Sequence, residues 1–76
     1  MNIEVKDIIT LNGKDKYIVS GKTIYQNETY YLLTGIPNFK DIKICVEVKD
    51  NEQIILEKVT EPELLDKVLP LFISSN

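Results

Sequence analysis

Apolar residues recur along the chain with two different periods. Five segments rich in apolar and β-branched residues, each closed by turn residues, are typical of β-strands. Alternation with polar residues is clearest over residues 41–49, whereas Tyr30-Tyr31-Leu32-Leu33 is apolar on both faces and indicates a central strand. Near the C-terminus apolar residues recur every three to four residues, which is typical of an amphipathic helix. The pattern predicts strands over residues 3–11, 16–25, 29–36, 41–49 and 53–59, followed by a helix over residues 61–69.

Short turn sequences separate the predicted strands. Asn12-Gly13 is a strong hairpin signal, because both residue types accept the positive φ angles of a type I′ turn. Gly21 interrupts the second strand and indicates a β-bulge or a strong bend. Asp7 interrupts the apolar face of the first strand, so either the chain bends there or the strand begins at that residue. Because the connections are short, the economical topology is an antiparallel meander.

Both ends of the predicted helix carry signals. Thr60 is the expected N-cap, and a glutamate three residues later completes a capping box. Pro62 falls in the first turn, where its missing N–H costs no hydrogen bond. Pro70 would remove a hydrogen bond from the helix interior. We therefore expect the helix to end near Leu69, and residues 71–73 to form a turn or an extended tail.

The apolar stripe of this helix needs a partner. The stripe consists of Leu64, Leu65, Val68, Leu69 and Phe72. The strand over residues 41–49 alternates most regularly, and it offers an apolar face made of Ile42, Ile44, Val46 and Val48. Its other face is polar and is expected to meet water.

These features predict an α+β, mainly β fold in a single domain over residues 1–76. We expect a five-stranded, strongly bent antiparallel meander, which is an SH3-like small barrel or half-barrel. We expect the C-terminal helix to pack on this sheet.

Composition removes several classes of function. The 76-residue chain contains no histidine, no arginine and a single cysteine. Nucleophiles and general bases that depend on histidine are therefore excluded, as is a Cys/His zinc site. One cysteine cannot form an internal disulfide. We expect no enzymatic activity, no bound metal and no cofactor.

Charge and hydropathy bear on partners and location. The formal net charge of −3 disfavours nucleic-acid binding, although a small β-barrel that stacks bases on its tyrosines is the alternative hypothesis. Glu4 and Asp7 stand where a secretion signal would need an uninterrupted apolar run. No segment has the ~18 apolar residues of a membrane span. We expect a cytoplasmic protein without membrane contact.

The order of short motifs resembles the YrzB-like family of small bacterial proteins. The resemblance covers residues 7–72 and rests on Asp7-Ile8-Ile9-Thr10-Leu11, Tyr30-Tyr31-Leu32-Leu33, and Leu56-Glu57-Lys58-Val59 before an acidic helix start. It implies the same fold and a cytoplasmic bacterial setting. Since the family has no established biochemical activity, the resemblance implies no catalytic residue.

Cys45 is the one residue with nucleophilic chemistry. Lys43, on the same strand face, would lower the pKa of its thiol, whereas Glu47 on that face would raise it. Because the chain supplies no histidine base and no second cysteine, we interpret Cys45 as a small apolar residue that fills part of the second sheet face.

The leading hypothesis is a non-enzymatic protein-interaction or regulatory module. Glu61, Glu63 and Asp66 form an acidic surface that either meets a basic partner or serves solubility. Phe39 lies in a loop, where it either plugs the end of the sheet or contacts a partner, and we favour the plug. The first strand is the less protected edge. Any homodimer is therefore expected to form through it, with Ile8 at the shared surface.

Overall fold

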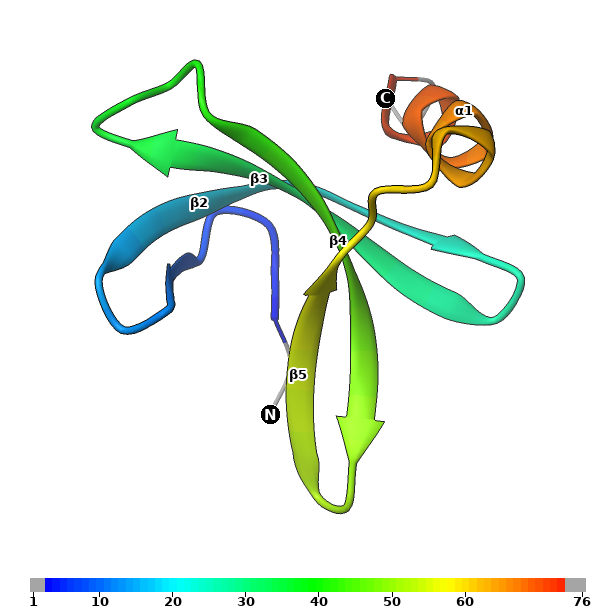
Figure 1. Ribbon diagram of the computed structural model, residues 1–76, viewed down its shortest axis with the longest axis horizontal. Coiled ribbons are helices and arrows are strands. Elements are labelled where there is room, and N and C mark those ends of the chain that lie inside the picture. Colours follow the sequence, from blue (N-terminus) through cyan, green and yellow to red (C-terminus); the bar gives the residue numbers. More distant parts are fainter. Residues whose placement is uncertain (1–2, 74–76) are drawn as a thin grey trace.

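A computed structural model describes residues 3–73 of the chain. Within them lie five strands and one helix: β1 (Ile8–Leu11), β2 (Asp15–Tyr25), β3 (Glu28–Ile36), β4 (Ile42–Asp50), β5 (Gln53–Lys58) and α1 (Pro62–Ile73). Consecutive strands pair antiparallel, in the order β1-β2-β3-β4-β5. The sheet curls into a half-barrel with α1 beside it (Figure 1). The predicted bent meander with one C-terminal helix is confirmed.

The turns follow the local sequence signals. Asn12 and Gly13 have φ angles of 54° and 75°, as the predicted type I′ geometry requires. Gln26 and Asn27 also have positive φ angles and join β2 to β3 directly. In β2 the pairing register shifts beside Gly21, which confirms the predicted bulge.

The first strand is shorter than predicted, because it begins at Ile8 rather than at residue 3. The side chain of Asp7 accepts a hydrogen bond from the N–H of Glu4 at 2.9 Å and closes a turn. Lys6 in this turn has a φ angle of 82°. Both alternatives for Asp7 therefore describe the structure: the chain bends over residues 4–7, and strand pairing starts beside Asp7, whose carbonyl accepts from the Val19 N–H.

The helix begins one residue later than predicted. The Leu65 N–H donates to the carbonyl of Glu61 at 3.0 Å, which places Glu61 rather than Thr60 at the N-cap. Pro62 is then the first helical residue, where its lack of an N–H costs no hydrogen bond.

The predicted helix end near Leu69 is wrong, because α1 continues through Pro70 to Ile73. The missing N–H of Pro70 would have bonded to the carbonyl of Asp66, and both residues are exposed, so water can satisfy that carbonyl. Continuing the helix keeps Phe72 one turn beyond Val68, in the same apolar cluster.

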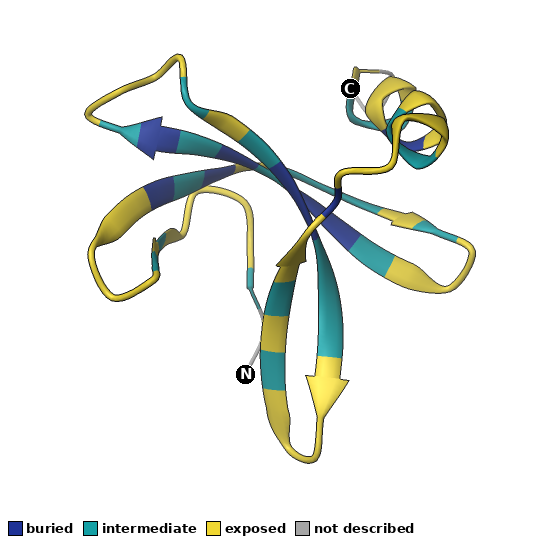
Figure 2. Ribbon diagram, viewed as in Figure 1, coloured by how far each residue is buried: buried dark blue, intermediate teal, exposed yellow. Residues whose placement is uncertain are grey.

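The core consists of two clusters on opposite faces of the sheet, since neighbouring residues such as Ile44 and Cys45 belong to different clusters. The buried residues of the sheet are concentrated in β2, β3 and β4 (Figure 2). The inner cluster receives side chains from every strand and is the interior of the half-barrel: Tyr17, Val19, Tyr31, Leu33 and Cys45, with Ile3, Ile9, Leu11 and Leu56 packed against it. The outer cluster joins the sheet to α1: Tyr30, Ile44, Val59 and Val68, with Tyr25, Leu32, Val46, Leu64, Leu65 and Phe72.

Three predictions about these faces need correction. Cys45 is buried in the inner cluster, so this face of β4 is not its wet side there. Ile44 and Val46 contact the helix cluster as expected, but Ile42 is exposed. Leu69 is 41% exposed and lies outside the outer cluster, although it was predicted to belong to the apolar stripe of the helix. Within residues 3–73, no helix has the length and apolar character to cross a membrane.

Candidate interaction surface

β1 is one edge of the sheet, since among the described strands it pairs only with β2. In an antiparallel pair, successive residues point their backbone groups alternately toward the partner strand and away from it. The Val19 N–H donates to the carbonyl of Asp7 at 2.8 Å, so the backbone groups of Ile8 and Thr10 point away from β2. The Ile8 side chain is 64% exposed. β1 therefore offers backbone hydrogen-bonding groups and an exposed apolar side chain at one residue.

β5 is the opposite edge of the sheet and is two residues longer than β1. The Val59 N–H donates to the carbonyl of Ile44 at 2.8 Å and fixes the alternation along β5. The backbone groups of Ile54, Leu56 and Lys58 consequently point away from β4. β5 can therefore form backbone hydrogen bonds with a further strand at these three alternate residues.

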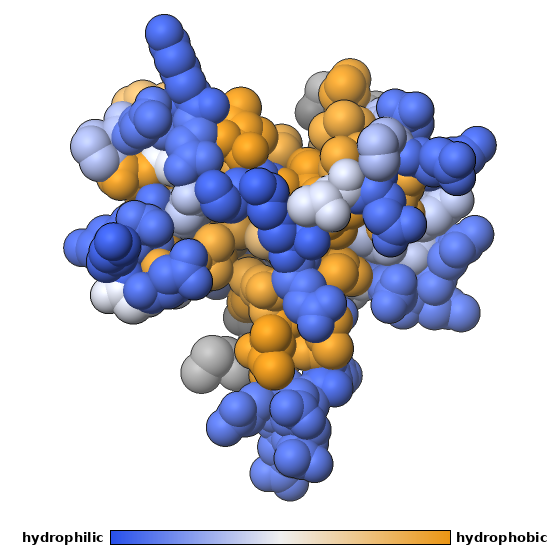
Figure 3. All heavy atoms as spheres, in the orientation of Figure 1, coloured by the Kyte–Doolittle hydropathy of each residue, from blue (hydrophilic) through white to orange (hydrophobic). Residues whose placement is uncertain are grey.

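A cleft of about 370 Å³ lies between the end of β1 and the β4–β5 hairpin. Its lining consists of Thr10, Leu11, Asn12, Lys43, Cys45, Leu56 and Lys58. Three of these, Leu11, Cys45 and Leu56, belong to the inner cluster, so the cleft reaches the interior of the half-barrel. Apolar surface also gathers over the middle of the β4–β5 hairpin, above its hydrophilic tip (Figure 3).

The charged residues of the cleft are Lys43 and Lys58. Lys43 forms an ion pair with Asp41 at 3.1 Å, and its ammonium lies 5.1 Å from the centre of the Tyr17 ring. Interactions with the Tyr17 hydroxyl and Asp41 raise the pKa of Lys43 above its usual value. Within residues 3–73 the two ion pairs involve Lys43 and Lys22, so Lys58 is the cleft lysine without an ion-pair partner.

Cys45 stands at the inner end of the cleft but is not an activated thiol. Burial raises its pKa, and the positive charges of Lys43 and Lys58 oppose that rise only in part. The thiol is therefore protonated at neutral pH. Its predicted role as a small apolar residue on the second sheet face agrees with this position.

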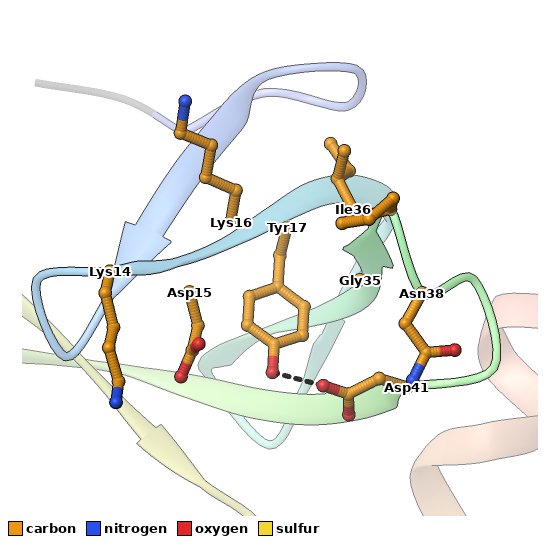
Figure 4. A pocket seen from close by; sticks show the side chains of 9 residues that line it. Lys14, Asp15, Lys16, Tyr17, Gly35, Ile36, Asn38 and Asp41 are labelled. Carbon is orange, nitrogen blue, oxygen red and sulfur yellow. Dashed lines mark hydrogen bonds between the residues drawn. The ribbon is translucent and has the colours of Figure 1, made fainter.

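A second hollow, of about 310 Å³, lies beside Tyr17 at the β3–β4 loop (Figure 4). The Tyr17 ring points toward Asp41 and its hydroxyl donates to that carboxylate at 2.6 Å, while Lys16 points away. Hydrogen bonds from Tyr17 and Lys43 lower the pKa of Asp41. Asp41 already accepts hydrogen bonds from these two donors. Its carboxylate therefore stabilises the fold and is not free to act as a general acid or base.

The other end of the inner face has a similar arrangement. The Tyr31 hydroxyl donates to Glu47 at 2.6 Å, and the Lys22 ammonium lies 5.9 Å from the Tyr31 ring centre. Burial, followed by the Glu47 hydrogen bond, raises the pKa of Tyr31. Lys22 also donates to the carbonyl of Ile3 at 3.0 Å, which holds the N-terminal segment over the inner cluster.

Phe39 does not plug the end of the sheet, because it is 68% exposed. The loop closes through its backbone instead. The Gly35 N–H donates to the carbonyl of Asp41 at 2.7 Å, and a Cβ on Gly35 would lie only 2.5 Å from the carbonyl oxygen of Asn38. This return places the loop backbone directly against Gly35, and Phe39 remains in solvent. Its role as a contact residue stays a prediction.

The predicted interaction residues do not form one site. Glu61, Glu63 and Asp66 are exposed at the start of α1. Ile8 belongs to β1, and Phe39 belongs to the loop between β3 and β4. In Figure 1 the blue N-terminal hairpin and α1 lie on opposite sides of the molecule, and the β3–β4 loop is separate from α1. The cleft residues were missed, although the alternation of Lys43 and Cys45 on one strand face was visible in the sequence.

Comparison with known proteins gives no relative. No protein-family model, no curated protein and no solved structure matches this chain. The resemblance of residues 7–72 to the YrzB-like family therefore stays a prediction. Among residues 3–73, no group of three or more acidic or cysteine side chains is placed to hold a metal ion.

Proposed function

We propose that this protein is a non-enzymatic protein-interaction module that binds protein chains, a second copy of itself included, at the open side of its half-barrel. The observation that supports the proposal is the pair of unpaired edges, β1 and β5, which flank a cleft lined by apolar residues and by Lys43 and Lys58. An exposed sheet edge is a ready template for another strand. With its single thiol reduced, such a module suits the cytoplasm, and the YrzB-like resemblance favours a bacterial source.

The burial of the tyrosines favours this function over nucleic-acid binding. A platform for bases needs aromatic faces open to solvent. Tyr17, Tyr30 and Tyr31 are buried, and their rings belong to the two core clusters. The remaining tyrosine, Tyr25, packs against the outer cluster. The described residues therefore offer little stacking surface.

The polar networks favour binding over catalysis. Asp41 and Glu47 each accept a short hydrogen bond from a tyrosine, and the pKa of Cys45 is raised by burial. A catalytic group has to be free to exchange a proton or to attack. These groups instead stabilise the fold.

The test is self-association through β1. Sedimentation equilibrium of the wild type up to hundreds of micromolar is expected to show a dimer, formed by two-fold pairing of β1 with β1 of the second copy. Ile8→Lys places a charge at that contact and should give a monomer with an unchanged circular dichroism spectrum. Ile24→Lys is the matched control, because Ile24 is 67% exposed but lies near the β2–β3 turn. A wild-type monomer at every concentration contradicts self-association, and a dimer that survives Ile8→Lys contradicts the choice of edge.

A further inference from the structure

We propose that the cleft between β1 and β5 binds an extended protein segment that adds to the free edge of β5 and carries an acidic side chain for Lys58. The inference rests on the proposed interaction function and specifies the partner's chemistry. The occupant is a strand with apolar side chains directed into the half-barrel, followed by a carboxylate.

The free backbone groups of β5 favour an extended occupant. Ile54, Leu56 and Lys58 each direct an N–H and a carbonyl away from β4. A segment in strand conformation satisfies such groups in register, as in other cases of β-strand addition. The N-terminal segment restricts where it can lie, because Ile3 lines a hollow with Gln53 and Ile54 at the other end of β5. The occupant therefore meets β5 at Leu56 and Lys58.

The lining of the cleft favours apolar side chains on the inward face of the segment. Leu11 from β1 and Leu56 from β5 are both partly buried and pack against the inner cluster from opposite sides. Side chains inserted between them would remove further apolar surface from water. In a strand, alternate residues point to the same face, so two inward positions are separated by one outward residue.

The charges around the cleft favour an acidic residue in the segment. Lys43 and Lys58 line the cleft, and Asp41 accepts a hydrogen bond from Tyr17 and forms an ion pair with Lys43. The charge of Lys58 acts on Asp41, but within residues 3–73 Lys58 forms no ion pair, so its ammonium can bind the carboxylate of a ligand. The chain as a whole has a net charge of −3, so this is a local positive site on an acidic protein, and it discriminates in favour of acidic segments. β1 of a second copy, with the sequence Ile-Ile-Thr-Leu, carries no carboxylate and is the poorer occupant.

Peptide titration followed by ¹H–¹⁵N NMR tests the proposal. The probe is a blocked six-residue peptide in which valine alternates with threonine and the last inward position is glutamate. A matched peptide has lysine at that position. The protein is the Ile8→Lys variant, so that pairing through β1 does not interfere. The glutamate peptide should shift the amides of Leu11, Leu56 and Lys58, and the lysine peptide should bind about tenfold more weakly.

Charge reversal identifies the contact. Lys58→Glu should weaken the glutamate peptide about tenfold and restore binding of the lysine peptide. Lys67→Glu, which makes the same charge change on the exposed side of α1, should leave both affinities unchanged. Equal weakening by the two variants would show a general charge effect and overturn the proposal.

Other occupants give different results. If octanoate shifts the same amides and neither peptide does, the cleft is a site for small amphipathic acids and the proposed extended segment is rejected. If millimolar peptide causes no shifts, the extended segment is rejected too. These outcomes are independent of the dimer test. If the wild type forms a dimer that Ile8→Lys abolishes, but no peptide shifts the cleft amides, only this inference is overturned. If the wild type is a monomer and no peptide binds, the proposed function is overturned as well.

Discussion

Gly21 in β2 lies directly against Phe72 in α1, and a Cβ atom on Gly21 would be 2.8 Å from Cδ1 of the phenylalanine ring. The position coincides with the bulge of β2. The missing side chain at the bulge thus lets the last turn of the helix approach the sheet.

Gly21→Ala should consequently destabilise the protein. The added methyl group forces the Phe72 ring to move within the outer cluster, and overpacking of this kind costs about 1–3 kcal/mol in the free energy of unfolding. Urea denaturation measures the loss. In a Phe72→Leu background the loss from Gly21→Ala should be smaller, because the two positions are coupled. Additive losses would show that Gly21 is required for its backbone conformation and not for the helix contact.

Val68 and Leu69 should respond differently to truncation. Val68 is fully buried between α1 and the sheet, so Val68→Ala should cost about 2 kcal/mol through lost burial and a cavity. Leu69→Ala should cost less than about 1 kcal/mol, since its side chain is 41% exposed. Chemical denaturation of both variants checks the order. The reverse order would mean that α1 is rotated relative to the face described above.

Asp41 should make stability depend on pH in the acid range. Hydrogen bonds from Tyr17 and Lys43 hold the pKa of the folded carboxyl below the reference value of 3.8. The folded state therefore binds fewer protons than the unfolded state, so the contribution is complete above that value and is lost as the pH falls through the folded pKa. Asp41→Asn should flatten this part of the curve of urea midpoint against pH.

Two variants complete the pH experiment. Tyr17→Phe removes the donor of the 2.6 Å hydrogen bond and should also reduce the acid dependence. Asp66→Asn removes one negative charge from the exposed side of α1 and controls for net charge. If Asp41→Asn and Asp66→Asn change the curve equally, the network around Tyr17 does not account for it.

Features set by neighbouring residues could be predicted from the sequence. Asn12 and Gly13 accept positive φ angles wherever they occur, so their turn needed no tertiary information. Gly21 marked the bulge in the same way, and the short connections then permitted little besides a meander.

Features set by distant contacts could not be predicted. Pro70 is a poor helix residue by local rules, yet α1 continues because the packing of Phe72 on the sheet outweighs one lost hydrogen bond. Phe39 remains in solvent on a loop that closes on Gly35, and the end of the sheet is occupied by the bond between Tyr17 and Asp41, which are 24 residues apart. The cleft likewise requires β1 and β5 to lie on either side of one opening.

The position of α1 after the sheet in the chain has a consequence for biosynthesis. All five strands leave the ribosome before the helix does, and each can pair with the strand made just before it. During that interval the outer-cluster residues Tyr30 and Ile44 have no helix to cover them. A sheet that forms before α1 docks therefore exposes this apolar face to other chains, and the exposure ends when Val68 and Phe72 pack against it.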